Sequence, residues 1–73
     1  MIEDFLYKLA ELEKATENSI VFARYSFGWE VHSFRDNTPF GFNKLKNGKE
    51  KNYAIVGKTF EEVFNKAYER IKK

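Results

Sequence analysis

The segment FNKLKNGKEKNY (residues 42–53) carries four lysines within eight residues, arranged around an Asn-Gly pair. Asn-Gly favours the two-residue type I′ turn of a β-hairpin, which would set the lysines in two cross-strand pairs on one face. Like charges opposite each other weaken a strand ladder, so the cluster predicts an anionic partner, either a phosphate backbone or an acidic protein surface. The alternative is a solvated hairpin tip that discourages edge-to-edge aggregation. The lysines are Lys44, Lys46, Lys49 and Lys51.

A second candidate surface lies in IVFARYSFGWEVHSF (residues 20–34), whose apolar and aromatic residues predict another hairpin. A three-residue loop, Ser26–Gly28, would use Gly28 in the left-handed conformation. In that register Tyr25 lies opposite Trp29 and faces the core, and an apolar and basic surface is left on the other face. Such a surface could bind a protein, stack single-stranded bases or be covered by a second copy of the chain. Its residues are Ile20, Phe22, Arg24, His32 and Phe34.

Catalytic and metal-binding patterns are not evident. His32 is the only histidine and the chain has no cysteine, so a metal site with imidazole and thiolate ligands is not expected. Gly57-Lys58-Thr59 resembles the end of a phosphate-binding loop, but Asn52 stands where that motif requires glycine. Thr59 is better explained as a helix N-cap. We therefore expect no enzyme, no cofactor and no small-molecule substrate.

The elements around these segments predict an α+β fold in a single domain, residues 1–73. Ile2, Phe5, Leu6, Leu9 and Leu12 recur at helical spacing and indicate a helix over residues 2–16. The second hairpin would pair Phe42 with Tyr53 and Phe40 with Ile55. Thr59 and Glu62 form a capping box before a helix whose apolar face is Phe60, Val63, Phe64, Ala67 and Ile71.

The predicted order is helix, an antiparallel meander of three or four strands, and helix, with both helices on one face of the sheet. Two points stay open from the sequence: whether residues 40–46 form a full strand, and which face of the sheet the helices cover. No signal peptide or membrane span is evident, and the net charge is only +2, so we expect a cytoplasmic location.

The order helix, three strands, helix is similar to the topology of the double-stranded-RNA-binding domain. That family has lysines at the start of its second helix, where this chain has Glu61 and Glu62. The chain also resembles small uncharacterised αβ proteins of phages and prophages, through "GKTFEEVFNKAYERI" and the Trp-containing "WEVHSF". That resemblance implies a compact accessory protein that acts by binding, sometimes by blocking a host protein.

Two hypotheses follow. The first is a non-enzymatic interaction module that binds a protein or associates with itself through the apolar face of the first hairpin, while the lysines orient an acidic partner. The second is a weak, sequence-independent nucleic-acid binder that uses the same lysines.

Overall fold

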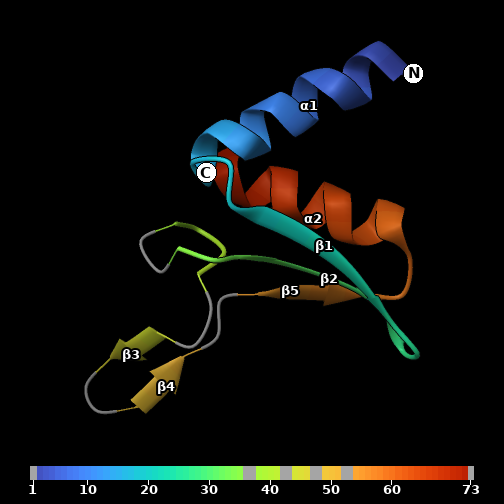
Figure 1. Ribbon diagram of the computed structural model, residues 1–73. Helices are drawn as coiled ribbons and strands as arrows, with labels where there is room; N and C mark the ends of the chain where they lie inside the picture. Colours follow the sequence, from blue (N-terminus) through green and yellow to red (C-terminus); the bar gives the residue numbers. More distant parts are fainter. Residues whose placement is uncertain (1, 36–37, 42–43, 47–48, 52–53, 73) are drawn as a thin grey trace.

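The computed structural model describes residues 2–35, 38–41, 44–46, 49–51 and 54–72, with the backbone alone in 44–46 and 49–51 (Figure 1). It confirms the predicted α+β class, with a helix at each end of an antiparallel meander. The elements are α1 (Ile2–Ala15), β1 (Ile20–Tyr25), β2 (Gly28–Ser33), β3 (Lys44–Lys46), β4 (Lys49–Lys51), β5 (Ile55–Gly57) and α2 (Phe60–Lys72).

The strands form two separate sheets. β1, β2 and β5 make a three-stranded sheet in that order, and β3 and β4 make a two-stranded ribbon inserted between β2 and β5. Figure 1 shows the ribbon set apart from the three-stranded sheet, on the side away from the helices. The meander itself therefore contains three strands, and its third strand follows the ribbon.

α2 begins where its capping box predicts. The Glu62 amide donates a hydrogen bond to Thr59 Oγ1 at 3.1 Å, and the Glu62 carboxylate accepts one from the Lys58 amide at 3.3 Å. These bonds satisfy backbone donors that a helix N-terminus leaves unpaired. α2 lies across β2 and β5, and α1 packs against α2 on the same side of the sheet (Figure 1).

The core lies between α2, α1 and one face of the three-stranded sheet. The apolar stripe predicted for α2 is confirmed, because Val63, Phe64 and Ala67 are buried. The apolar stripe predicted for α1 is only partly buried. Leu12 is buried, whereas Ile2 and Leu6 are 76% and 56% exposed. The buried apolar residues are Leu12, Val31, Phe40, Ile55, Val63, Phe64 and Ala67, with Phe5, Leu9, Ile20, Phe22, Trp29, Phe60 and Ile71 packed around them.

The predicted register of the first hairpin is wrong by one residue. Tyr25 pairs with Gly28 and Arg24 with Trp29, so the loop is Ser26-Phe27 and Gly28 is the first residue of β2. Gly28 has a φ of +145°, and a Cβ built on it would lie 2.2 Å from the Gly57 carbonyl oxygen. The glycine at position 28 therefore lets Gly57, the last residue of β5, lie close to β2. It does not serve as the left-handed residue of a turn.

The second hairpin is confirmed in part. The β3–β4 register has the two lysine pairs that the Asn-Gly turn predicts. The predicted pair Phe42–Tyr53 lies outside the described residues. Phe40 is not in a strand, and Ile55 pairs with Val31 of β2 instead. Phe40 is fully buried, and its carbonyl accepts a 2.8 Å hydrogen bond from the Ser33 amide, so it extends the core at the end of the sheet.

Candidate functional site

One face of the three-stranded sheet is covered by the helices, and aromatic contacts identify which. Trp29 of β2 meets Phe60 of α2 edge to face at 5.2 Å between ring centroids. Phe22 of β1 lies 5.1 Å from the same ring. Because successive side chains of a strand point to opposite faces, the neighbours of these residues lie on the uncovered side. This open face consists of Val21, Ala23, Tyr25, Glu30, His32 and Val56.

The surface predicted from the first hairpin is therefore divided between the two faces. Ile20 and Phe22 pack against the core on the helix-covered side. Arg24 shares their side of β1 by alternation and is exposed near the hairpin loop. His32 lies on the open face, and Phe34 continues it beyond the end of β2. The structure thus does not bring the five predicted residues onto one face. The one-residue shift in register places the predicted residues of β1 on the covered face and those of β2 and its continuation on the open face.

Exposed aromatic rings flank the open face at both ends. Tyr25 and Phe27 stack at the hairpin loop with centroids 5.3 Å apart and ring planes 6° from parallel. At the other end, Phe34 meets the His32 ring edge to face at 6.0 Å. Tyr25, Phe27, Phe34 and Val56 are 44%, 64%, 75% and 52% exposed. These large side chains define an apolar surface that neither helix covers.

A polar pair lies in the middle of the open face. His32 Nδ1 is 3.1 Å from Glu30 Oε2, and the two side chains are only 17% and 14% exposed. Both residues belong to β2 and lie two positions apart, so the strand alternation places them side by side. The pair places one carboxyl and one imidazole group in the middle of the open face.

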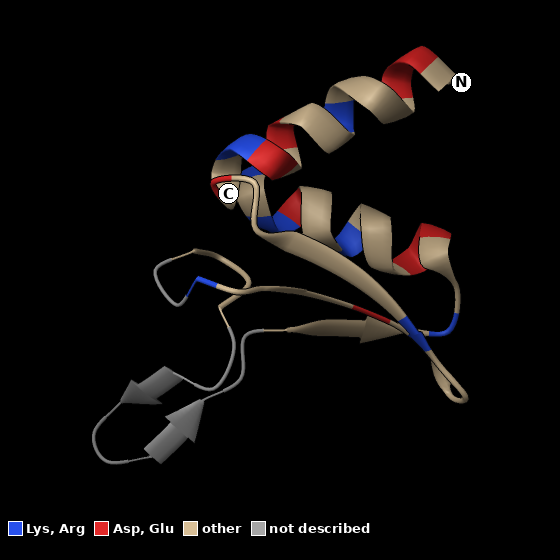
Figure 2. Cartoon of the chain, viewed as in Figure 1, with Lys and Arg blue, Asp and Glu red and all other residues tan. Residues whose placement is uncertain are grey.

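Charge is sparse on the three strands. Their charged residues are Arg24 on the covered side and Glu30 on the open face, and the helices carry most of the other described charges (Figure 2). Among the described strand residues, none on the open face is a lysine or arginine. The open face therefore lacks the cations that a phosphate backbone requires.

The lysine hairpin is a separate candidate. Its backbone register pairs Lys44 with Lys51 and Lys46 with Lys49, as the Asn-Gly turn predicts. The side chains of these lysines lie outside the described part of the structure. Like-charged pairs in a short ribbon are unfavourable without a counter-charge. Anion binding by this ribbon therefore stays a prediction.

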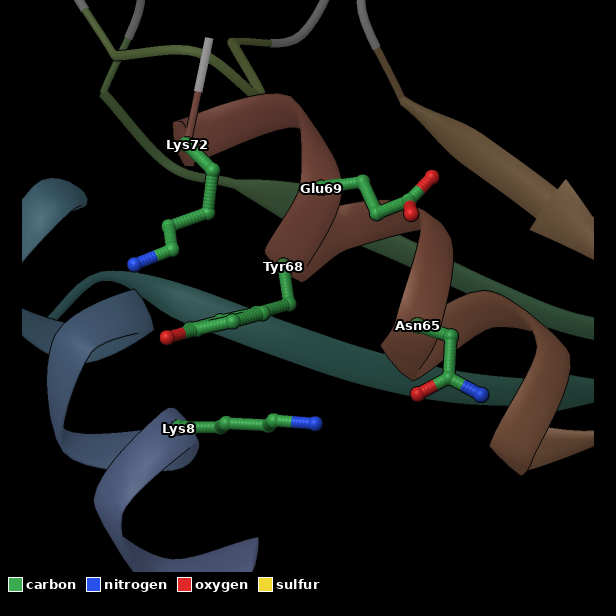
Figure 3. A pocket seen from close by; sticks show the side chains of 5 residues that line it. All are labelled: Lys8, Asn65, Tyr68, Glu69 and Lys72. Carbon is green, nitrogen blue, oxygen red and sulfur yellow. The ribbon is translucent and has the colours of Figure 1, made fainter. Parts of the chain in front are cut away.

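A cavity between the two helices contains two lysines around an aromatic ring (Figure 3). Lys8 Nζ of α1 lies 5.2 Å from the Tyr68 ring centroid, and Lys72 Nζ lies 5.3 Å from it. Lys8 also forms an ion pair with Asp4 at 3.2 Å. The Lys8 contact joins α1 to α2, whereas the Lys72 contact lies within α2. Together they account for the two lysines without a ligand. The lining residues are Lys8, Asn65, Tyr68, Glu69 and Lys72.

Two titratable groups with displaced pKa lie on the helices, away from the open face. A hydrogen bond with Glu11 raises the pKa of Tyr7. The hydrogen bond from Lys66, followed by that from the Lys58 amide, lowers the pKa of Glu62. Both shifts have local structural causes, and neither side chain belongs to a cluster suited to proton transfer.

Within the described ranges, no three His, Cys, Asp or Glu side chains come together in a group that could hold a metal ion. Of the helices in the described part of the chain, none is long and apolar enough to cross a membrane.

Tyr25, Phe27 and Val56 are open-face or flanking residues that the sequence did not single out. The Ser26-Phe27 loop could have been favoured by placing two aromatic rings together at the hairpin end, which stabilises an exposed loop. Comparison of the chain with protein-family models, curated proteins and solved structures found no match.

Proposed function

We propose that this chain is a non-enzymatic, cytoplasmic interaction module that binds a protein partner through the open face. It would be an accessory or regulatory protein of the phage and prophage kind that the sequence resembles. The observation that carries the proposal is the set of exposed large side chains on and beside the sheet, uncovered by either helix. Large exposed apolar side chains gathered on one side of a small protein mark a candidate interaction site.

The chemistry of the open face favours a protein over a nucleic acid. Tyr25, Phe27 and Phe34 supply aromatic area of the type enriched in protein interfaces. Glu30 would repel phosphate, whereas a protein can present a backbone amide, lysine or arginine to it. The partner that fits is therefore an apolar protein segment with a donor or cation opposite the Glu30–His32 pair.

The test is a quantitative pull-down from an extract of the cell that makes the protein. Three immobilised chains are compared: wild type, the double variant Phe34→Ser with Val56→Ser, and the control Tyr7→Ser. Tyr7 is 51% exposed on α1, outside the open face. We expect wild type and the control to retain the same protein and the double variant to lose it. Equal retention by all three chains would contradict the proposal.

The lysine ribbon supports a second candidate function, weak nucleic-acid binding without sequence preference. The observation in its favour is the backbone register, which places Lys44 opposite Lys51 and Lys46 opposite Lys49. Phosphate contacts by four lysines would give log affinity a slope of about −3 against log salt. Fluorescence anisotropy of a short labelled oligonucleotide over a salt series measures that slope, and the variant with all four lysines changed to Gln should lose it.

A further inference from the structure

We infer that a second copy of this chain pairs with the outer edge of β1, so that two three-stranded sheets become one continuous sheet. β1 and β5 are the two edges of the sheet, because β2 lies between them. An edge strand presents unpaired backbone donors and acceptors, which form a template for another strand. This inference concerns an edge and not the open face, so it does not rest on the proposed function.

The hydrogen-bond ladder shows which groups β1 presents outward. Phe34 N–H donates to the Ser19 carbonyl at 3.2 Å, just beyond the β1–β2 pairing. In an antiparallel ladder, hydrogen-bonded pairs alternate with pairs whose backbone groups point away from each other. Counting from Ser19, the amides and carbonyls of Ile20, Phe22 and Arg24 point away from β2. Within the described residues, no hydrogen bond reaches these outward groups.

The edge at β5 is different. The same alternation turns the backbone of Val56 outward, and there the Lys66 ammonium group donates to the Val56 carbonyl at 3.4 Å. Lys66 belongs to α2, so a helix side chain covers this edge, and covering an edge with a helix is a common means of preventing strand addition. β5 is also only three residues long, whereas β1 has six residues without lysine or proline. β1 is therefore the edge that is suited to pairing.

An apolar stripe on α1 flanks the same edge. Phe5 of α1 and Phe22 of β1 both contact the Phe60 and Phe64 rings, so α1 lies on the β1 side of α2. Lys8 points toward α2, where it meets Tyr68. Leu6 lies about 160° around the helix from Lys8, because each residue turns the helix by about 100°.

Leu6 therefore faces away from α2, and Ile2 lies one helical turn before it on the same stripe. They are 56% and 76% exposed, although each is a large aliphatic side chain. A second copy on β1 would bring its own α1 beside this stripe. The exposed leucine and isoleucine would then be buried against the same residues of the partner.

β1 is complementary to itself in one antiparallel register. With a two-fold axis at Phe22, all three outward residues of each copy pair, and Arg24 lies opposite Ile20 of the second copy. No like charges meet, and Val21 lies opposite Ala23 of the second copy on the open face. Such self-complementarity is what a two-fold symmetric interface requires. The pairing would also join the two open faces into one larger surface.

Sedimentation of the wild-type chain over a range of concentrations tests the inference, with Arg24→Pro as the edge variant. Proline at residue 24 removes an outward N–H that β2 does not use, and Arg24→Ala is the control because it keeps that N–H. We expect a wild-type dimer, retained by Arg24→Ala. The Arg24→Pro change should raise the dissociation constant about tenfold or more, since each copy loses a hydrogen bond at the interface. Circular dichroism checks that each variant folds.

A second pair of variants keeps the test decisive if Arg24→Pro does not fold. Leu6→Glu places a charge on the α1 stripe, and Val56→Glu places the same charge at a site of similar exposure on the open face. Leu6→Glu should weaken the dimer about tenfold or more and Val56→Glu should leave it unchanged. A wild-type chain that stays monomeric up to about 1 mM overturns the inference. So does a dimer that Val56→Glu disrupts and Leu6→Glu does not.

Discussion

The covered and open faces of the three-stranded sheet carry similar kinds of side chain but differ in what lies against them. Phe22, Trp29 and Val31 pack under the rings of α2, and Val31 is fully buried. Tyr25 and Val56, on the opposite face, remain about half exposed. The residue type alone therefore does not decide whether an aromatic or branched side chain of this sheet is buried in the core. The pleat of the strand decides which side it takes, and α2 covers only one side.

This difference separates stability from recognition. Loss of a ring on the covered face leaves a cavity among close-packed neighbours, which costs stability. Loss of a ring on the open face removes surface that water already contacts. The following predictions test that separation, beginning with the largest effect.

Phe22→Ala and Phe34→Ala compare two phenylalanines that belong to the same hairpin region and that the sequence placed on one face. Phe22→Ala should lower the free energy of unfolding by about 3 kcal/mol, because its ring packs on Phe60 and Phe64. Phe34→Ala should change it by less than about 0.5 kcal/mol, because Phe34 is 75% exposed. Urea unfolding followed by circular dichroism measures both. Equal effects would show that the two rings share one environment.

Gly28 tests the register that creates the two faces. Gly28→Ala should cost about 2 kcal/mol or more, because its Cβ would collide with the Gly57 carbonyl and its φ of +145° disfavours a side chain. Gly28→Asn should cost at least as much. Asparagine tolerates the left-handed turn of the alternative register, so a stable Gly28→Asn protein would favour that register instead. Ser26→Ala in the loop is the control, and urea unfolding is again the measurement.

The smallest expected effect concerns the cap of the helix that covers the sheet. The hydrogen bond from Lys66 is the main cause of the lowered pKa of Glu62, which should titrate below its usual 4.5. A lowered folded-state pKa stabilises the protein above the unfolded pKa, and this contribution is lost as the pH falls through the folded value. NMR titration of the Glu62 carboxyl measures the pKa, and Lys66→Met should raise it. An unchanged pKa in Lys66→Met would contradict the assignment.

Local signals predicted part of the fold. Thr59 and Glu62 predicted the start of α2, and the period of Val63, Phe64 and Ala67 predicted its buried side. The Asn-Gly pair predicted the β3–β4 register, because few other turns suit that dipeptide. Each of these features depends on residues within a few positions of one another, so the sequence contains the information directly.

The candidate site depended on contacts between distant residues. The helical period alone could not show which residues of the α1 stripe the rest of the fold covers. Leu12 is buried, whereas Ile2 and Leu6 are exposed. The membership of the open face needed the hairpin register, and the sequence placed Gly28 in the loop because glycine is typical of turns. The observed loop is Ser26-Phe27, and Gly28 lies against Gly57, a contact that no local turn rule contains.

The sequence by itself determined the helices, the α+β order and the turn of the lysine ribbon, since capping, helical period and Asn-Gly chemistry act over short distances. Only the tertiary structure decided which side of each strand faces water. That decision lies in the packing of β5 beside β2, where the Gly57 carbonyl leaves no room for a side chain at residue 28. A contact between residues far apart in the chain thus selects the register, and a one-residue change of register exchanges the faces.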